Sequence, residues 1–277
     1  MPYPDYTGWK YHFFKFMEKF TCLLSTNVQP DSLLNQDLAI KEGLFPAYKG
    51  HVLGKGSAQG VDLSRFNIKK KEEWRNKIRK NFSIDDSIKV FCFIGRIVPQ
   101  KGVNELLEAF IRLDKRDSFL FIVGAPDEIE SLNTFWLKKA KSMNNIVFTG
   151  AVNNPEMFHA SADYLVLPSY REGFPNTILE AGALGVPSIV TRINGMIDLI
   201  VEGETGFICD VKSVGSLYMS MLKAYSTNIN DYKRLSNNVY SAVKNSFDSE
   251  SMKELFLDDR NKLVEKAKLK VKFFNKK

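Results

Sequence analysis

The sequence predicts an α/β protein built on a doubly wound parallel sheet. From about residue 89 to residue 243, short apolar runs alternate with segments whose apolar residues recur at helical spacing. Runs that are apolar at every position are typical of strands buried on both faces of a parallel sheet. In such sheets, ligands bind beyond the carboxyl ends of the strands. We therefore expect the functional residues in loops that follow strands.

The predicted elements alternate regularly along this region. Strands are expected at 89–97, 120–124, 146–150, 164–168, 188–191 and 207–210. Helices are expected at 103–113, 128–142, 155–161, from Pro175 onward, 214–224 and 231–243. The helix at Pro175 has clear end signals, because proline suits a first turn, Gly185 suits the position after the helix and Pro187 blocks continuation.

The flanking segments are mostly helical by the same criteria. Residues 9–20 carry Trp9, Phe13 and Phe16 at helical spacing with lysines between them. Such a helix either packs its apolar face on the rest of the protein, the reading that we favour, or lies on an anionic bilayer. Further elements are expected as a strand at 21–26, a helix at 31–42 ended by Gly43, a strand at 51–53, and a last helix within 250–277 that ends in a lysine-rich, structureless tail.

Composition sets the class of protein. The 277 residues are 44% hydrophobic and 26% charged, which is ordinary for a globular protein of one large or two modest domains. The net charge of +7 favours anionic partners, but nucleic-acid binding rests on charge alone because no nucleic-acid motif accompanies it. Three widely separated cysteines predict a reducing compartment. We expect a cytoplasmic protein, with peripheral contact at the inner membrane face as an alternative. The three histidines, His12, His51 and His159, are expected to be surface or packed residues rather than ligands.

Residues 168–181 are the most informative stretch of the chain. An apolar run at 164–167 is followed by a glycine turn and by the start of a helix. Helix starts leave backbone N–H groups unpaired, and these bind anions. Glu172 precedes the helix and Glu180 lies inside it. Carboxylates beside an anion pocket suit a ligand that carries both hydroxyls and phosphates, such as a sugar nucleotide.

The same stretch carries a family resemblance. L-P-S-Y-R-E-G-F-P at 167–175, continued by L-E-A-G-A-L-G-V-P at 179–187, resembles the E-x7-E signature of retaining glycosyltransferases of family 4. The resemblance implies the C-terminal half of a GT-B fold, which is a Rossmann-like domain that binds a UDP- or GDP-sugar. G-R-I-V-P-Q-K-G at 95–102 resembles a second family segment, in which the arginine and lysine grip the donor diphosphate. Two cations there would neutralise the charge that grows as the glycosidic bond breaks.

The resemblance implies a role for each candidate residue. Arg96 and Lys101, beside Gly95, would hold the diphosphate, and Glu180 would accept hydrogen bonds from the ribose. Glu172, the catalytic candidate, would contact the transferred sugar. The loop at 150–152, with Val152, would meet the nucleobase through its backbone, and 191–195 would close over the sugar. The backbone of the helix start completes the set: Gly173, Phe174, Pro175, Asn176 and Thr177.

Two other kinds of chemistry are less favoured. Paired carboxylates also serve glycosidases, but those enzymes need no diphosphate grip. No Asp-x-Asp motif or metal-ligand cluster stands out, so we expect no metal and no cofactor besides the nucleotide-sugar substrate. The glycines of 54–60 are not spaced as in a dinucleotide-binding loop and do not open directly into a helix.

The resemblance also predicts the domain organisation. Gly60-Val61-Asp62 and Phe66 resemble the passage between the two GT-B domains. Residues 1–55 would then be a remnant of an acceptor-side domain, 56–248 the donor-binding domain, and 249–277 a helix that braces the N-terminal part. The predicted function is transfer of a sugar to a glycan or lipid-linked acceptor in bacterial surface polysaccharide synthesis, with a partner chain supplying the missing domain. The alternative is a non-catalytic sugar-nucleotide-binding module. Exposed apolar surface on Trp9, Phe13, Phe16 and the last helix would favour a partner chain or a membrane over an independent module.

Overall fold

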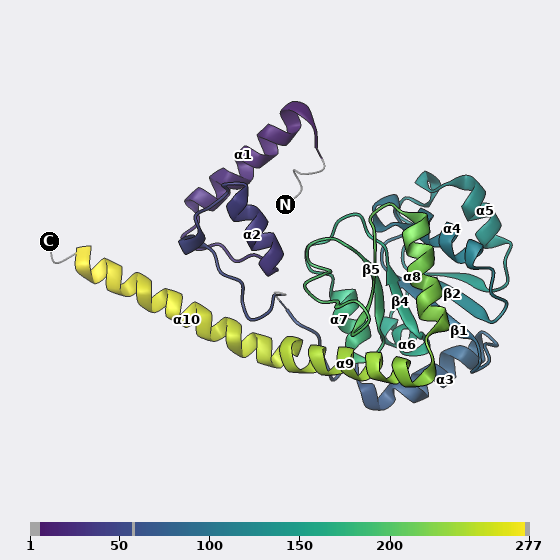
Figure 1. Cartoon of the computed structure of the whole chain (residues 1–277). Helices are drawn as coiled ribbons and strands as arrows, with labels where there is room; N and C mark the ends of the chain where they lie inside the picture. Colours follow the sequence, from purple (N-terminus) through teal and green to yellow (C-terminus); the bar gives the residue numbers. More distant parts are fainter. Residues whose placement is uncertain (1–5, 57–58, 275–277) are drawn as a thin grey trace. The chain divides into compact units, whose positions relative to one another are not determined.

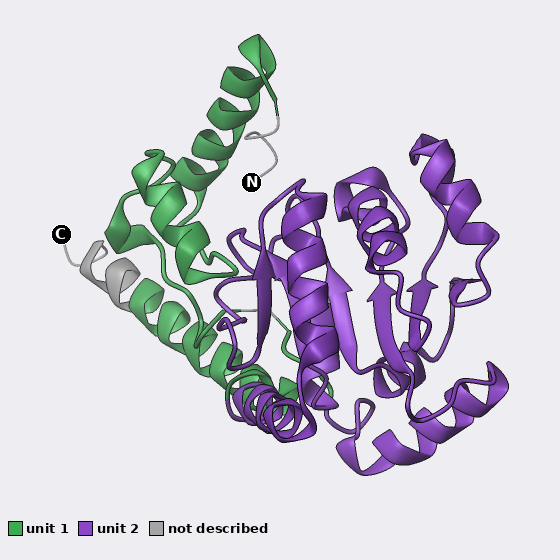
Figure 2. Ribbon diagram, turned by 45° about the vertical axis from the view of Figure 1, so that its right-hand side comes forward, with its two compact units in different colours: residues 1–62, 246–277 green, residues 63–245 purple. Residues whose placement is uncertain are grey.

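The computed structural model describes residues 6–56 and 59–274, with side chains described up to residue 268 (Figure 1). The chain divides into two compact units (Figure 2). One consists of residues 1–62 and 246–277, and the other consists of residues 63–245.

The larger unit contains the predicted doubly wound sheet. Six parallel strands are hydrogen-bonded in the order β3-β2-β1-β4-β5-β6. Their bounds are β1 Lys89–Ile94, β2 Ser118–Val123, β3 Ile146–Gly150, β4 Tyr164–Leu167, β5 Ser188–Thr191 and β6 Gly206–Cys209. All six were predicted. The first strand is shorter than expected, because the chain turns at Gly95.

Helices cover both faces of this sheet. Cys92 of β1 is paired with Phe121 of β2, so their side chains point to the same face, and Phe91 points to the opposite one. The ring of Phe121 packs 5.4 Å from that of Phe158, in helix α6 (Pro155–Ser161). The ring of Phe91 packs 6.2 Å from that of Phe110, in helix α4 (Val103–Leu113). The helices α4 and α6 therefore lie on opposite sides of the sheet.

Most helices of this unit match their predictions closely. The α-helices are α3 Lys71–Asn81, α4 Val103–Leu113, α5 Thr134–Lys141, α6 Pro155–Ser161, α7 Asn176–Ala183, α8 Val214–Ser226 and α9 Ile229–Phe247, the last of which ends in the smaller unit. Helix α3 was not predicted, because its sequence is so highly charged that Trp74 and Ile78 alone mark its apolar face. The helix expected at 128–142 is instead a short 3-10 turn followed by α5. The side chain of Asn133 caps α5 by accepting from the N–H groups of Phe135 and Trp136.

The smaller unit contains α1 Gly8–Leu24, α2 Leu33–Lys41 and α10 Ser249–Phe274, with a 3-10 turn at Ala47–Lys49. The strand predicted at 21–26 is wrong, since the helix continues to Leu24. The strand predicted at 51–53 is also wrong. Among the described residues near it, the β-pairing consists of one isolated bridge, between Val28 and Gly50. The predicted structureless tail is wrong as far as Phe274, and residues 275–277 lie outside the described part.

Helix α1 buries one face and exposes another. Tyr11, Phe14 and Cys22 pack on a small core of Ala39, Leu44 and Phe45, and Lys15 forms an ion pair with Glu42. The opposite stripe is exposed, from 44% to 71%, at Trp9, Phe13, Phe16, Phe20 and Leu23. The favoured expectation that the helix packs its aromatic face is therefore wrong for this stripe. In the described part of the chain, no helix is both long and apolar enough to cross a membrane.

A buried ion pair ties the start of the sheet to α3. Arg79 is 2% exposed and donates through Nη2 to Oδ2 of Asp163 at 2.9 Å, while Oδ2 also accepts from the backbone N–H of Val90 at 2.7 Å. The guanidinium donates further to the carbonyls of Ser161, Asp85 and Ile88. Because each of the three guanidinium nitrogens donates to at least one acceptor, the buried charge is tolerated.

We predict that Asp163→Ala lowers the free energy of unfolding by about 3–5 kcal/mol, because it leaves the Arg79 guanidinium buried without its counter-charge. Urea denaturation followed by tryptophan fluorescence measures this. A Trp9→Phe background leaves Trp74 and Trp136 as reporters, both within residues 63–245. The matched control is Asp210→Ala, which removes an exposed pair with Arg192 and should change stability by less than about 1 kcal/mol. Equal losses in the two variants would contradict the assignment.

Candidate functional site

The two sequence motifs meet where the strand order of the sheet reverses. Strands β1 and β4 are neighbours, with Phe91 opposite Tyr164 and Cys92 opposite Leu165. The chain leaves β1 toward α4 on one face of the sheet and leaves β4 toward α7, which packs against α6 on the other face, so the two loops lead to opposite faces. Such a topological switch point is where open α/β sheets bind ligands. Residues 95–102 follow β1, and residues 168–175 follow β4 (Figure 1).

The two loops are locked together by backbone contacts. The N–H of Tyr170 donates to the carbonyl of Gln100 at 2.9 Å. Gly102 has φ +70°, and a Cβ atom there would lie 2.1 Å from the carbonyl oxygen of Pro168. Only glycine allows this approach, because any side chain would collide with the backbone of the other loop. The hydroxyl of Tyr170 donates to Oε1 of Glu105 at 2.7 Å. Burial, together with this hydrogen bond, raises the pKa of Tyr170 and keeps its hydroxyl protonated.

An ion pair spans the gap between the loops. Nζ of Lys101 lies 2.5 Å from Oε1 of Glu172, and the two side chains are 23% and 12% exposed. Arg96 is exposed, and its side chain makes no hydrogen bond or ion pair with the described residues. A lysine ammonium has three N–H groups, so Lys101 can hold a second anion while it contacts Glu172. The structure therefore brings Lys101 and Glu172 together and leaves the Arg96 guanidinium available.

Helix α7 carries the second glutamate. Pro175 is its N-cap rather than part of its first turn, so Asn176 and Thr177 supply the first N–H groups of the helix, which have no partner within it. The helix ends as predicted: Gly185 has φ +61°, its N–H donates to Gly182, and the N–H of Val186 donates to Ala181. Glu180 is 27% exposed, and its Oε2 lies 3.3 Å from Nε2 of His159 in α6.

The remaining predicted residues lie at the ends of other strands. Gly95 donates to Val123 at 2.9 Å and ends β1. A Cβ atom at Gly195 would lie 1.9 Å from the carbonyl of Gly173, which places the 191–195 loop directly against the glutamate loop. Phe174, also in that loop, is half-buried. Val152 follows β3 and is half-buried. Val152 therefore lies at the same edge of the sheet as the two motif loops, but β2 separates its strand, β3, from β1.

Two residues with contacts in this site were not predicted. His159 was expected to be a surface or packed residue; it is packed, but it also contacts Glu180. Its neighbours Met157, Phe158 and Ala160 are apolar, which could have indicated burial, but nothing in the sequence identifies its partner. Glu105, the partner of Tyr170, lies in the first turn of α4, and no spacing rule links it to a residue 65 positions away.

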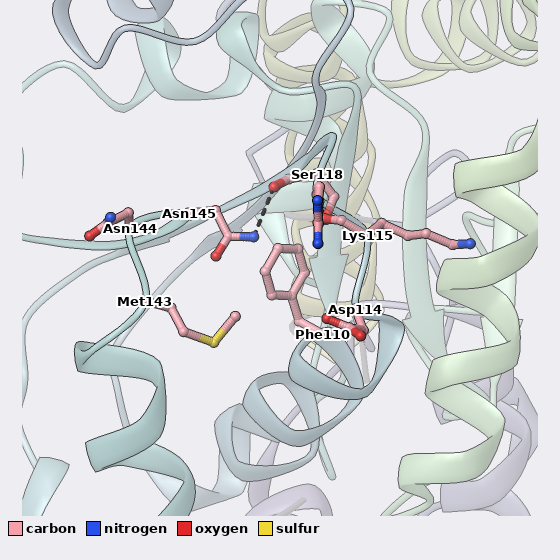
Figure 3. Close-up of a pocket in the computed structure, with 8 residues that line it drawn as sticks. Phe110, Asp114, Lys115, Ser118, Met143, Asn144 and Asn145 are labelled. Carbon is pink, nitrogen blue, oxygen red and sulfur yellow. Dashed lines mark hydrogen bonds between the residues drawn. The ribbon is translucent and has the colours of Figure 1, made fainter.

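A separate hollow lies at the opposite edge of the sheet (Figure 3). It is formed where α4 ends at Asp114 and where β2 begins at Ser118, and the side chain of Asn145 donates to the carbonyl of Ser118 at 3.0 Å. None of the predicted site residues lines it. Among residues 6–56 and 59–274, no group of three His, Cys, Asp or Glu side chains is placed to hold a metal ion.

Comparison with known proteins identifies the family. The family model described as Glycosyl transferases group 1 matches residues 74–242, more than half of the chain. The chain belongs to this family. One relative that aligns with most of this chain is the capsular polysaccharide biosynthesis glycosyltransferase CapM of Staphylococcus aureus. It is 30% identical over 91% of this chain and 67% of its own length. The UDP-Gal:alpha-D-GlcNAc-diphosphoundecaprenol alpha-1,3-galactosyltransferase of Escherichia coli is 25% identical over 88% of this chain and 63% of its own.

Solved structures show the same fold. A glycosyltransferase from Rickettsia africae superposes with a TM-score of 0.79 at 20% identity, over 91% of this chain and 67% of that one. Anabaena HepE, solved in complex with UDP and glucose, superposes with a TM-score of 0.77 at 18% identity, over 91% of this chain and 68% of that one. The parallel sheet flanked by helices is therefore the architecture of GT-B glycosyltransferases. The chain spans about two thirds of CapM and about one third of two other curated relatives.

We predict that Gly102→Ala destabilises the larger unit by about 2–5 kcal/mol, because left-handed backbone costs alanine about 1–2 kcal/mol and the clash with Pro168 adds about 1–3. Gly203→Ala is the matched control, since Gly203 has φ +73° but nothing within 4 Å of its added Cβ. Urea denaturation of both variants separates backbone strain from the clash. A loss no larger at Gly102 than at Gly203 would show that the contact between the two loops is unimportant.

Proposed function

We propose that residues 63–245 bind the donor of a retaining glycosyltransferase of family 4 type, in bacterial surface polysaccharide or lipid-linked glycan synthesis. The observation that carries this proposal is the meeting of the two motifs at the switch between β1 and β4. There the Lys101–Glu172 ion pair, the start of α7 and the exposed Arg96 border one edge of the sheet. A diphosphate and a sugar need this combination of cations, helix N–H groups and carboxylates.

The diphosphate is assigned to Arg96, Lys101 and the start of α7. Each charge-assisted hydrogen bond contributes about 1.5–3 kcal/mol, and the end of a helix contributes about 0.3–1 kcal/mol. The two cations therefore dominate affinity, while the N–H groups at Asn176 and Thr177 orient the phosphates. Gly95, at the end of β1, lets the diphosphate approach the backbone.

The two glutamates are assigned to different hydroxyl groups. Glu180 accepts from the ribose, and Glu172 contacts the transferred sugar beside the backbone of Gly173, Phe174 and Pro175. The contact of Glu172 with Lys101 puts the sugar-binding and phosphate-binding groups within one hydrogen bond of each other. The nucleobase is assigned to the loop at Val152, after β3.

In the proposed reaction, the bond from the anomeric carbon to the donor phosphate breaks and a bond to the acceptor oxygen forms on the same face. The acceptor proton passes to the leaving phosphate, whose growing charge Arg96 and Lys101 stabilise. No metal is required in this scheme. Proton NMR of the product tests the stereochemistry, because inversion at the anomeric carbon would contradict it.

Relatives support a nucleotide-sugar donor without choosing its base. Among them are the E. coli enzyme named for UDP-Gal and a Corynebacterium glutamicum enzyme named GDP-mannose-dependent alpha-mannosyltransferase, 36% identical over 56% of this chain and 35% of its own. We propose a UDP- or GDP-sugar donor, and we propose a cytoplasmic site of action.

The acceptor side is proposed to come from polypeptide outside residues 63–245. The first and last helices both expose apolar side chains: the stripe of α1, and Leu257 and Val264 of α10. Exposed apolar surface on these helices favours a partner chain or a membrane over an independent module. An apolar stripe of this kind is ordinarily covered. A non-catalytic module that holds a sugar nucleotide remains the alternative function.

We predict that the purified chain binds UDP or GDP, with one strongly preferred, and that Lys101→Met weakens binding about 10- to 150-fold, which corresponds to one charge-assisted hydrogen bond. Arg96→Ala and Glu180→Ala should also weaken it. Glu172→Gln should retain nucleotide binding but lose the added affinity of the sugar conjugate. Calorimetric titration with UDP, GDP and one sugar conjugate of each measures all of these effects.

The matched control is Lys223→Met, which removes an exposed lysine paired with Glu202 and should leave affinity unchanged. Absence of nucleotide binding by the folded chain would overturn the proposal of a donor site. Nucleotide binding with no sugar transfer, even when an acceptor-side partner is supplied, would favour the non-catalytic module.

A further inference from the structure

His159 is fully buried beneath the candidate ribose carboxylate. Its side chain is 0% exposed, in a turn of α6 that packs against α7. Its ring packs against that of Phe66 in a T-shaped arrangement, with ring centroids 6.0 Å apart and planes inclined at 70°. Nε2 lies 3.3 Å from Oε2 of Glu180. This is the one hydrogen bond that either side chain makes among the described residues.

The surroundings determine which ring nitrogen carries the proton. A carboxylate only accepts hydrogen bonds, so Nε2 must be the donor. Nδ1 is buried and has no partner in the described part of the chain. A proton on Nδ1 would leave an unpaired buried donor and would turn the Nε2 lone pair toward a carboxylate oxygen. The Nε2–H tautomer avoids both costs.

The contact leaves one carboxylate oxygen free for a ligand. Oε2 of Glu180 is held from inside the protein, while Oε1 makes no hydrogen bond with the described residues. A half-buried glutamate without a partner would otherwise sample several rotamers, and ordering such a side chain on binding reduces affinity. A fixed donor beneath it removes that loss.

We propose that His159 is a positioning residue of the donor site, whose buried Nε2–H orients the Glu180 carboxylate to accept hydrogen bonds from ribose hydroxyls. This inference rests on the proposed function, because it requires that Glu180 bind the ribose. It assigns no contact between His159 and the ligand. Its effect should therefore depend on the ribose hydroxyls and on no other part of the nucleotide.

The test compares a nucleoside diphosphate with its 2′,3′-dideoxy analogue, using whichever base the chain prefers. The affinity for the nucleoside diphosphate, divided by the affinity for its dideoxy analogue, isolates the contribution of the ribose hydroxyls. We expect His159→Leu and His159→Asn to lower this ratio roughly three- to tenfold, which is the cost of one unordered side chain. His159→Gln should restore it, because the glutamine amide reaches the position of Nε2 and the asparagine amide reaches only that of Nδ1. Binding of the dideoxy analogue should stay unchanged throughout.

If His159 had only a structural role, the affinities of the two ligands would change in a different pattern. Both ligands would then lose affinity together, in proportion to the fall in melting temperature, and the ratio would stay constant. A constant ratio, while Glu180→Ala still lowers it, overturns the role of His159 and leaves the donor site intact. Absence of nucleotide binding by the unaltered chain overturns the donor site itself.

A second measurement needs no ligand. With three histidines in the chain, long-range proton–nitrogen NMR of the imidazoles can be assigned by single substitution. We expect the Nε2–H tautomer for His159, with a nitrogen shift that changes in Glu180→Gln and not in Glu204→Gln, an exposed control. The Nδ1–H tautomer, or no response to Glu180→Gln, would overturn the proposal.

Discussion

The adjacency of β1 and β4 is the constraint on which the rest of the site depends. Parallel crossovers are right-handed, so a chain that adds strands on one side of β1 and then returns to the other side must change faces of the sheet. The sheet does this between β3 and β4, by way of α6. The loops after β1 and β4 then lead to opposite faces, which makes the boundary between these two strands the topological switch point of the sheet. Both sequence motifs lie in these two loops.

Close backbone contacts hold the strand-end loops together at this switch point. Gly102 against Pro168 and Gly195 against Gly173 bring three strand-end loops nearer than any side chain would permit. The Lys101–Glu172 pair then fixes two charges that come from residues 71 positions apart in the sequence. Charges held in place before a ligand arrives need little reorganisation when negative charge develops on a leaving group. The two ion pairs differ in their surroundings, because the Arg79 side chain is 2% exposed whereas that of Lys101 is 23% exposed.

The sequence was informative where local chemistry determines structure. Apolar runs predicted all six strands, and the Gly185–Pro187 signals predicted the end of α7, because these depend on neighbouring residues alone. Residues 21–26 and 51–53 were misread as strands, since strand formation depends on a neighbouring strand to accept the hydrogen bonds, which their apolar residues cannot reveal. Helix α3 was missed because its charges hide a narrow apolar face. The motifs directed attention to the loops at 95–102 and 168–175, which the structure brings into contact, but they did not predict that Lys101 and Glu172 touch, nor that His159 lies beneath Glu180.

The two units differ in what they contain (Figure 2). All the candidate donor-binding residues lie within residues 63–245. The unit of 1–62 and 246–277 has a small core and an exposed aromatic stripe on α1.

The most direct measurement is a crystal structure of this chain grown with its preferred nucleoside diphosphate. We expect phosphate oxygens between Arg96, Lys101 and the first turn of α7, with the ribose on Oε1 of Glu180. A nucleotide bound at any other place, such as the hollow near Asp114 and Asn145, would contradict it.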